Sequence, residues 1–141
     1  MSKRGKKQPR RRRVVIAKAS APAWGVRWHP KALEEKRAIK EVNDRVAIDH
    51  VIEKLKVDGV ALRSPHQSAV MGEEGSGLRE LRPRRGRSRW RPLYCQVGER
   101  LFAILAVAPE VEVDSAGYES GVRSAKRRLV QLEKGKGSKR K

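Results

Sequence analysis

The chain has 141 residues and a formal net charge of +19, because 35 Lys and Arg outnumber 16 Asp and Glu. This length suits one domain and excludes a multidomain enzyme. Apolar residues make up 38% of the sequence and aromatic residues 4%, which allows a modest core with little room for a deep hydrophobic cavity. A charge this positive favours contact with nucleic acid.

Basic side chains dominate both ends of the chain. Residues 1–13 hold eight of them and residues 134–141 hold five, with no acid in either stretch. Such segments bury too little apolar surface to offset the entropy lost on ordering. We therefore expect a disordered basic arm at 1–23, a folded domain at 24–133 and a basic tail at 134–141.

The N-terminal sequence also bears on location. Its apolar stretch at residues 14–17 is too short for the core of a secretory signal, and a lone Cys95 forms no internal disulfide, as in a reducing compartment. We therefore expect a cytoplasmic protein. The acid-free first 33 residues also fit an organellar transit peptide, although their basic residues are clustered rather than spread in an amphipathic pattern.

Residues 24–29 alternate large apolar side chains with other residues, which predicts a half-buried strand. Pro30 is placed to open a helix, and residues 31–42 are mostly good helix formers. Asn43 and Asp44 are expected to break this helix and to cap a second one.

The second helix carries one apolar stripe, with residues at i, i+3, i+4 and i+7. Its members are Ile48, Val51, Ile52 and Leu55. Gly59 is placed to end the helix, so the two helices form a hairpin. Residues 61–76 contain Pro and Gly without periodicity and are expected to be a connecting loop.

Three further strands are predicted, at residues 78–82, 90–97 and 101–108. Gly98 suits the first central position of a type II′ turn, so the last two strands should pair antiparallel. Residues 101–108 are apolar at consecutive positions, which predicts a central strand covered on both faces. This run is far shorter than the roughly 20 residues of a membrane-spanning helix, so we expect no membrane partner.

After a loop at residues 109–117, apolar side chains at helical spacing predict a last helix that ends at Gly135. They are Val122, Ala125, Leu129 and Leu132. The order of elements predicts an α+β fold, a small antiparallel sheet packed by an N-terminal helical hairpin and a C-terminal helix, with the helices on one side.

The segment from Arg82 to Arg91 has six arginines in ten positions. The planar guanidinium matches phosphate oxygens, so the segment predicts a site for the backbone of RNA or DNA. Trp90 and Tyr94 are candidate stacking surfaces. The predicted nucleic-acid contacts are Arg84, Arg85, Arg87, Arg89 and Trp90. The alternative is a solvated basic loop, with Trp90 in the core.

Other chemistries find little support. The three histidines lie 16 to 21 residues apart without a cysteine at ligand spacing, so we predict neither a metal site nor another cofactor. The glycine-rich segment 72–77 contains two carboxylates that would repel a phosphate, and we interpret it as a loop. Cys95 lies within a predicted strand and is expected to be a packing residue.

Residues 77–82 (G-L-R-E-L-R) and 90–94 (W-R-P-L-Y), followed by a glycine turn and an apolar strand, resemble the HigB-like branch of the RelE-type toxin superfamily. In that family a G-L-x-E-L-R strand precedes an aromatic-Arg-x-x-Tyr strand, and the other elements agree in order over about residues 24–133. The resemblance implies a RelE-like fold and a cytoplasmic bacterial or phage toxin. It also implies an endoribonuclease that cleaves mRNA on the ribosome without a metal and is silenced by an antitoxin protein.

In the mechanism that this resemblance implies, the RNA 2′-hydroxyl attacks the adjacent phosphate while the protein orients the phosphate, stabilises its charge and moves protons. Arg82 and Arg91 occupy the family's arginine positions as the implied phosphate clamp. Tyr94 is an implied proton donor or stacking group. The structural alternatives are two arginines that satisfy sheet-edge groups and a core tyrosine. Glu80 shares a face with Arg82 and is expected to pair with an arginine.

Two departures from the family pattern keep other functions open. Residues 109–114 contain three acids where the family commonly has lysines, and His66 and Gln67 precede the first motif without a lysine. One alternative is therefore a catalytically degenerate RNA- or DNA-binding protein. If the protein does cleave RNA, His66 could take the place of a missing lysine as a titrating group. Another is a basic ribosome- or virion-associated protein, suggested by the basic ends.

Overall fold

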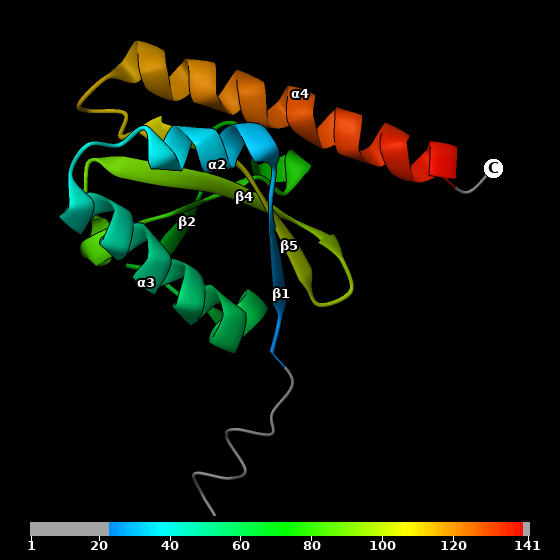
Figure 1. The fold of residues 1–141 in the computed structure, drawn as a ribbon, viewed down its shortest axis with the longest axis horizontal. Helices are drawn as coiled ribbons and strands as arrows, with labels where there is room; N and C mark the ends of the chain where they lie inside the picture. Colours follow the sequence, from blue (N-terminus) through cyan, green and yellow to red (C-terminus); the bar gives the residue numbers. More distant parts are fainter. Residues whose placement is uncertain (1–22, 140–141) are drawn as a thin grey trace, which may run out of the picture.

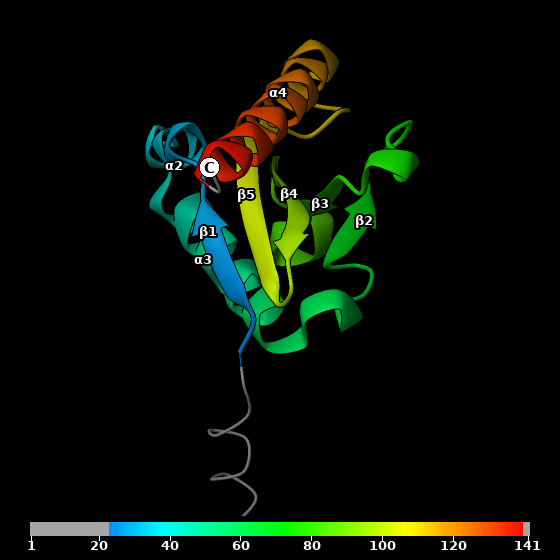
Figure 2. The ribbon, with the colours of Figure 1, turned by 90° about the vertical axis from the view of Figure 1, so that its right-hand side faces the viewer.

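The computed structural model describes residues 23–139, apart from the side chains of residue 74 and residues 135–139. One five-stranded sheet lies between helices on both faces (Figure 1 and Figure 2). The strands are β1 (Gly25–Trp28), β2 (Gln67–Ala69), β3 (Arg79–Leu81), β4 (Trp90–Gly98) and β5 (Leu101–Pro109). The helices are α2 (Pro30–Arg37), α3 (Val42–Asp58) and α4 (Ser115–Lys139), with 3-10 turns η1 (Gly59–Ala61), η2 (Glu74–Ser76) and η3 (Pro83–Gly86).

The α+β prediction is confirmed, with two corrections. The strand order is β1-β5-β4-β3-β2, and β1 runs parallel to β5 while the other neighbours are antiparallel. The helices do not lie on one side, because α2 and α3 pack on one face and α4 packs on the other. The physical reason is that residues 102–108 of β5 are all buried, so each face of the strand needs a cover.

The free edge of β5 shows how the helices are fixed to the sheet. β1 ends at Trp28, opposite Ile104, and leaves the rest of this edge without a partner strand. Glu35 of α2 accepts a hydrogen bond from the Val107 backbone N–H at 2.9 Å, and Arg128 of α4 donates to the Leu105 carbonyl at 2.8 Å. Arg128 and Glu35 also pair at 2.9 Å, so one ion pair satisfies the edge and joins the two helices.

The predicted break between the first two helices is misplaced. Helix α2 ends at Arg37, and α3 begins at Val42 with Glu41 as its N-cap, so Asn43 and Asp44 lie in the first turn of α3. Arg45 holds the intervening turn, because its guanidinium donates to the Ile39 and Lys40 carbonyls. Asp44 suits the positive end of the α3 dipole without acting as the cap.

The predictions for the later elements are mostly confirmed. Strand β2 was missed, since it has three residues and lies within the predicted loop. The β4–β5 turn is not type II′, because Arg100 rather than Gly98 has a positive φ, and a register shift between Gln96 and Gly98 precedes the turn. Strand β5 is covered on both faces as predicted, but β4 holds the middle of the sheet.

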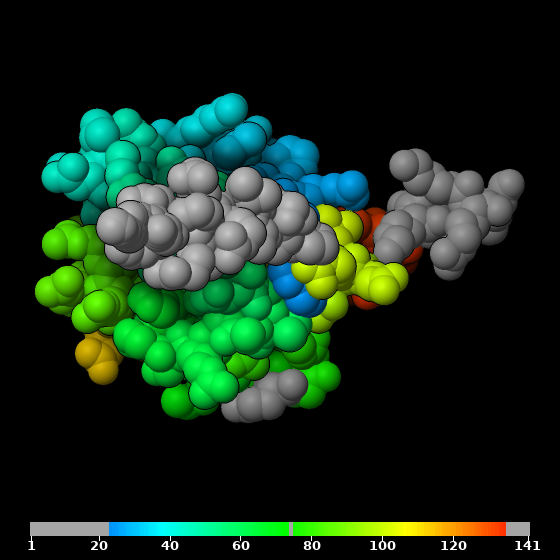
Figure 3. Space-filling model, turned by 90° about the horizontal axis from the view of Figure 1, so that it is seen from below, coloured from blue at the N-terminus to red at the C-terminus, as the bar shows by residue number. Residues whose placement is uncertain are grey.

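The ends of the chain are placed only in part. The predicted arm at 1–23 lies almost wholly outside the described residues, and α4 continues past Gly135 to Lys139, into the predicted tail. Near the start of the described chain, the Trp24 and Gly25 backbone N–H groups donate to the Lys56 and Arg100 carbonyls. Strand β1 therefore begins beside the β4–β5 turn and the last turn of α3, and Figure 3 shows its start (blue) next to the yellow-green turn.

The N-cap of α2 predicts a pH dependence of stability. The His29 Nδ1 accepts a hydrogen bond from the Lys31 backbone N–H at 3.0 Å, and burial, assisted by Arg128, lowers the pKa of His29. The unfolded chain therefore binds this proton more readily, and we expect stability to fall as the pH drops below the ordinary imidazole range. His29→Asn keeps a cap acceptor without the titration, so it should reduce the difference in Tm between pH 7.5 and pH 5.5. An unchanged difference would contradict this role.

Candidate nucleic-acid interface

The arginine-rich segment forms the turn η3 and the start of β4. Arg84 and Arg85 have φ values of 56° and 58°, in the left-handed region that costs an L residue about 1 kcal/mol. Together with Arg87 and Arg89 they are exposed, as a site for phosphate requires. The structure therefore brings four of the predicted contact residues to one cationic turn.

Arg82 stands at the base of this turn and keeps access to solvent. Its Nη1 donates to Glu80 Oε2 at 2.6 Å, and about a third of its side chain is exposed (34%). The expected pairing of Glu80 with an arginine is thus confirmed. This carboxylate orients Arg82 and also neutralises part of the charge that a phosphate would meet.

Arg91, in contrast, lies inside the protein with a side-chain exposure of 1%. Its guanidinium donates to the carbonyls of Ser88 at 2.6 Å, Trp90 at 3.0 Å and Gly86 at 3.1 Å, and to Glu110 Oε2 at 3.3 Å. In this conformation it does not reach a phosphate, and it fixes the shape of the arginine turn instead. Burial lowers the pKa of Arg91, as does Arg82, while the carboxylates of Glu80 and Glu110 raise it.

Tyr118 completes this network from the opposite helix. Its hydroxyl donates to Glu80 Oε1 at 2.5 Å, which joins α4 to β3. Burial and the hydrogen bond to Glu80 raise the pKa of Tyr118, so the hydroxyl keeps its proton. The sequence analysis missed this residue, although it lies one helical turn before Val122 on the predicted apolar stripe.

We expect Tyr118→Phe to lower the free energy of unfolding by roughly 2 kcal/mol, because the buried Glu80 carboxylate loses the hydrogen bond at its Oε1 and keeps only its arginine partners at Oε2. Urea denaturation followed by circular dichroism measures the loss. Glu119→Gln, an exposed change on the same helix, is the control and should leave stability nearly unaltered. Equal effects of the two substitutions would mean that the hydrogen bond contributes nothing.

Two of the three acids that depart from the family pattern have structural partners. Glu110 pairs with Arg91, and the Asp114 Oδ1 accepts a hydrogen bond from the Gly117 backbone N–H at 2.9 Å, in the first turn of α4. These two carboxylates therefore stabilise the path from β5 to α4. Glu110 also places negative charge beside Arg91, one of the two arginines that the resemblance implies as a clamp.

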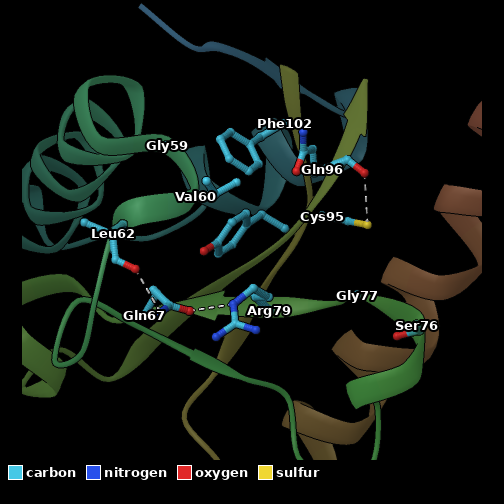
Figure 4. Close-up of a pocket in the computed structure, with 11 residues that line it drawn as sticks. Gly59, Val60, Leu62, Gln67, Ser76, Gly77, Arg79, Cys95, Gln96 and Phe102 are labelled. Carbon is cyan, nitrogen blue, oxygen red and sulfur yellow. Dashed lines mark hydrogen bonds between the residues drawn. The ribbon is translucent and has the colours of Figure 1, made fainter. Parts of the chain in front are cut away.

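Tyr94 does not join the arginine cluster. It lies opposite Arg79 in the sheet, is buried, and packs edge-on against Phe102 with ring centroids 5.6 Å apart. It lines a cavity of about 510 Å³, in which Arg79 donates to the Gln67 side-chain carbonyl at 2.6 Å (Figure 4). Burial raises the pKa of Tyr94. The position agrees with the alternative of a core tyrosine.

Trp90 is half-buried and packs against the core under α3, which agrees with the alternative of a core tryptophan. Its Nε1 is buried and has no hydrogen-bond partner among the described residues. The Arg89 guanidinium lies 5.8 Å from the centre of its ring, a cation–π contact. The Trp90 ring thus packs against the Arg89 guanidinium, and only part of the ring is exposed for stacking with a base.

Features of other kinds of site are scarce in the part of the chain that the structure describes. There, no cluster of three or more His, Cys, Asp or Glu side chains is placed to hold a metal ion. Cys95 is buried in β4, where burial raises the pKa of its thiol, as expected of a packing residue. No helix in residues 23–139 is both long and apolar enough to cross a membrane.

The fold has a known counterpart. No protein-family model and no curated protein matches the sequence. A solved structure of the Escherichia coli toxin RelE, a variant with two arginines changed to alanine and in the free state, is similar with a TM-score of 0.51 and 16% identity. The similarity covers 72% of this chain and 96% of that chain. The chain therefore has a RelE-like fold, as the sequence predicts.

Proposed function

We propose that the protein is a HigB-like toxin, a metal-independent endoribonuclease that cleaves mRNA on the ribosome in the cytoplasm and is neutralised by an antitoxin protein. The observation that carries this proposal is the exposed arginine turn with Arg82 at its base, on a RelE-like fold. In this account residues 24–133 are the ribonuclease domain. The basic segments 1–23 and 134–141 add salt-sensitive contacts to ribosomal RNA.

The proposed cleavage requires the protein to position the RNA phosphate and to stabilise the negative charge that develops on it. The RNA 2′-hydroxyl gives its proton to solvent as its oxygen attacks the adjacent phosphorus. The P–O5′ bond breaks, a 2′,3′-cyclic phosphate forms, and the 5′-oxygen takes a proton from solvent and leaves as a hydroxyl. Arg82 is the group placed to meet the phosphate oxygens, and Arg84, Arg85, Arg87 and Arg89 hold the flanking backbone. Arg91, implied as the second half of the clamp, acts as a positioning residue, because it is buried and holds the turn.

The second candidate function is RNA binding without cleavage. The observation that favours it is the pairing of Arg82 with Glu80 and of Arg91 with Glu110, which reduces the positive charge available to a reacting phosphate. The burial of Tyr94 agrees, because it leaves the implied proton donor away from the arginines. Binding and cleavage therefore have to be measured separately.

Induced expression in a bacterial host, with growth and RNA binding followed in parallel, tests the proposal. The intact chain should arrest growth, and Arg82→Ala should relieve the arrest while RNA affinity falls by less than about tenfold. Arg27→Ala, an exposed arginine on β1, is the control and should still arrest growth. Strong RNA binding without growth arrest by the intact chain would favour the second function.

A further inference from the structure

A groove of about 280 Å³ lies between α3 and the arginine turn, on the side of η3 away from α4. Its polar lining consists of His50, Lys54, His66, Arg84, Arg85 and Arg87. Ala47 and Val51 form its apolar floor, and no carboxylate is among the lining residues. Four permanent positive charges and two imidazoles therefore face one hollow.

The fold builds this groove from two sides. Residues 47, 50, 51 and 54 share one face of α3, with the two smaller side chains buried and the two longer ones on the rim. From the other side, Arg84 and Arg85 stand in left-handed backbone that glycine adopts without cost. Two arginines in this strained conformation favour a functional role for the turn, in addition to its role in the fold.

The nearest acids on α3 are engaged elsewhere. Glu53 pairs with Lys56 at 3.1 Å, and Asp49 pairs with Lys36 of α2 at 2.6 Å. The charged groups that face the two imidazoles are therefore Lys54 from α3 and the three arginines from the turn. Asn43, which lies beside His50 and Arg84 in a neighbouring hollow, is uncharged.

We propose that this groove binds a phosphate of single-stranded RNA, separate from the phosphate at Arg82, and that His50 and His66 are part of the site. RNA as the ligand rests on the proposed function, whereas the affinity for phosphate rests on the lining alone. The backbone N–H of Arg82 donates to the His66 carbonyl at 2.8 Å, so the groove and the Arg82 site share one piece of chain. One RNA strand could therefore engage both sides of the turn.

The probe is a fluorescein-labelled 2′-O-methyl oligouridine, which lacks the attacking hydroxyl and so reports binding without cleavage. Anisotropy titrations with the full chain should show that Lys54→Gln weakens binding about threefold to tenfold and lowers the salt slope by about 0.7. Lys31→Gln, an exposed lysine on α2, is the matched control and should change neither quantity.

A second measurement separates this proposal from the proposed function. The chain has three histidines, and the imidazole NMR signals of His50 and His66 should shift when inorganic phosphate is added, while those of His29 stay in place. Such shifts without RNA binding would overturn RNA as the ligand and leave the phosphate site standing. Binding by Lys54→Gln equal to that of the intact chain, or equal shifts of all three histidines, would overturn the groove as a site.

Discussion

Arg91→Ala is expected to lower the free energy of unfolding by roughly 3 kcal/mol or more, the largest single effect at the candidate site. The substitution removes hydrogen bonds to three backbone carbonyls, and it leaves the Glu110 carboxylate without its cation. Glu80 keeps Arg82 and Tyr118 as partners, which limits the loss. Chemical denaturation at neutral pH measures it.

Arg82→Ala is the matched control, because it removes the same side chain from the same network at a position with 34% exposure. We expect a loss of about 1 kcal/mol or less from this partly exposed ion pair. Arg91→Ala is therefore unsuitable as a test of catalysis, since a protein that does not fold is inactive whatever its function. Equal stabilities of the two variants would show that Arg91 does not hold the turn.

Gly59→Ala is the second change with a large expected effect, at the end of α3. Gly59 has φ 57° and ψ −132°, a conformation that other residues rarely adopt, and an added Cβ would lie 2.1 Å from the Trp24 ring. That ring stacks on Phe102 with centroids 5.0 Å apart. Backbone strain and the loss of this stacking together predict a loss of roughly 3 kcal/mol.

Gly77→Ala is a comparison in which an added Cβ meets no close neighbour. Gly77 also has a positive φ, 78°, but the nearest side-chain atom to an added Cβ is the Cys95 Sγ at 3.8 Å, an ordinary contact. We expect about 1 kcal/mol of destabilisation there, from backbone strain alone. If Gly59→Ala costs no more than Gly77→Ala in urea denaturation, the Trp24 ring moves aside freely and contributes little to the end of α3.

The sequence predicts most of the fold because its periodic segments are long. The apolar stripes on α3 and α4 have the spacing of a helix, and the apolar run of β5 is typical of a buried strand. The apolar run already implied cover on both faces, so the expectation of helices on one side conflicted with it. Strand β2 left no pattern in three residues, and its pairing with β3 depends on contacts distant in sequence.

The candidate site was harder to predict, for a physical reason. In a strand buried on both faces, alternation no longer tells which side chains reach solvent, and an arginine in such a strand looks like a surface residue. Arg91 is instead satisfied by carbonyls of the turn beside it and by Glu110 from the next loop. The role of Tyr118 was missed for a different reason, because its partner Glu80 lies 38 residues earlier in the chain, on β3.

In the proposed function, the two faces of the arginine turn have different tasks. Toward α4, the buried network of Glu80, Arg91 and Tyr118 holds the turn in place. Toward solvent and α3, Arg82 and the exposed arginines carry the positive charge that we propose binds RNA. A rigid internal network with a cationic exterior is what positioning of a phosphate requires.

The most direct test of the central claim is the chemistry of the RNA ends. Purified protein is incubated with ribosomes that carry mRNA, and the recovered fragments are analysed beside those from Arg82→Ala. If the proposed function holds, new ends with 2′,3′-cyclic or 3′-phosphate and 5′-hydroxyl groups are made by the intact chain and lost in the variant. Intact mRNA on ribosomes that bind the protein, or ends with 3′-hydroxyl and 5′-phosphate groups, would contradict it.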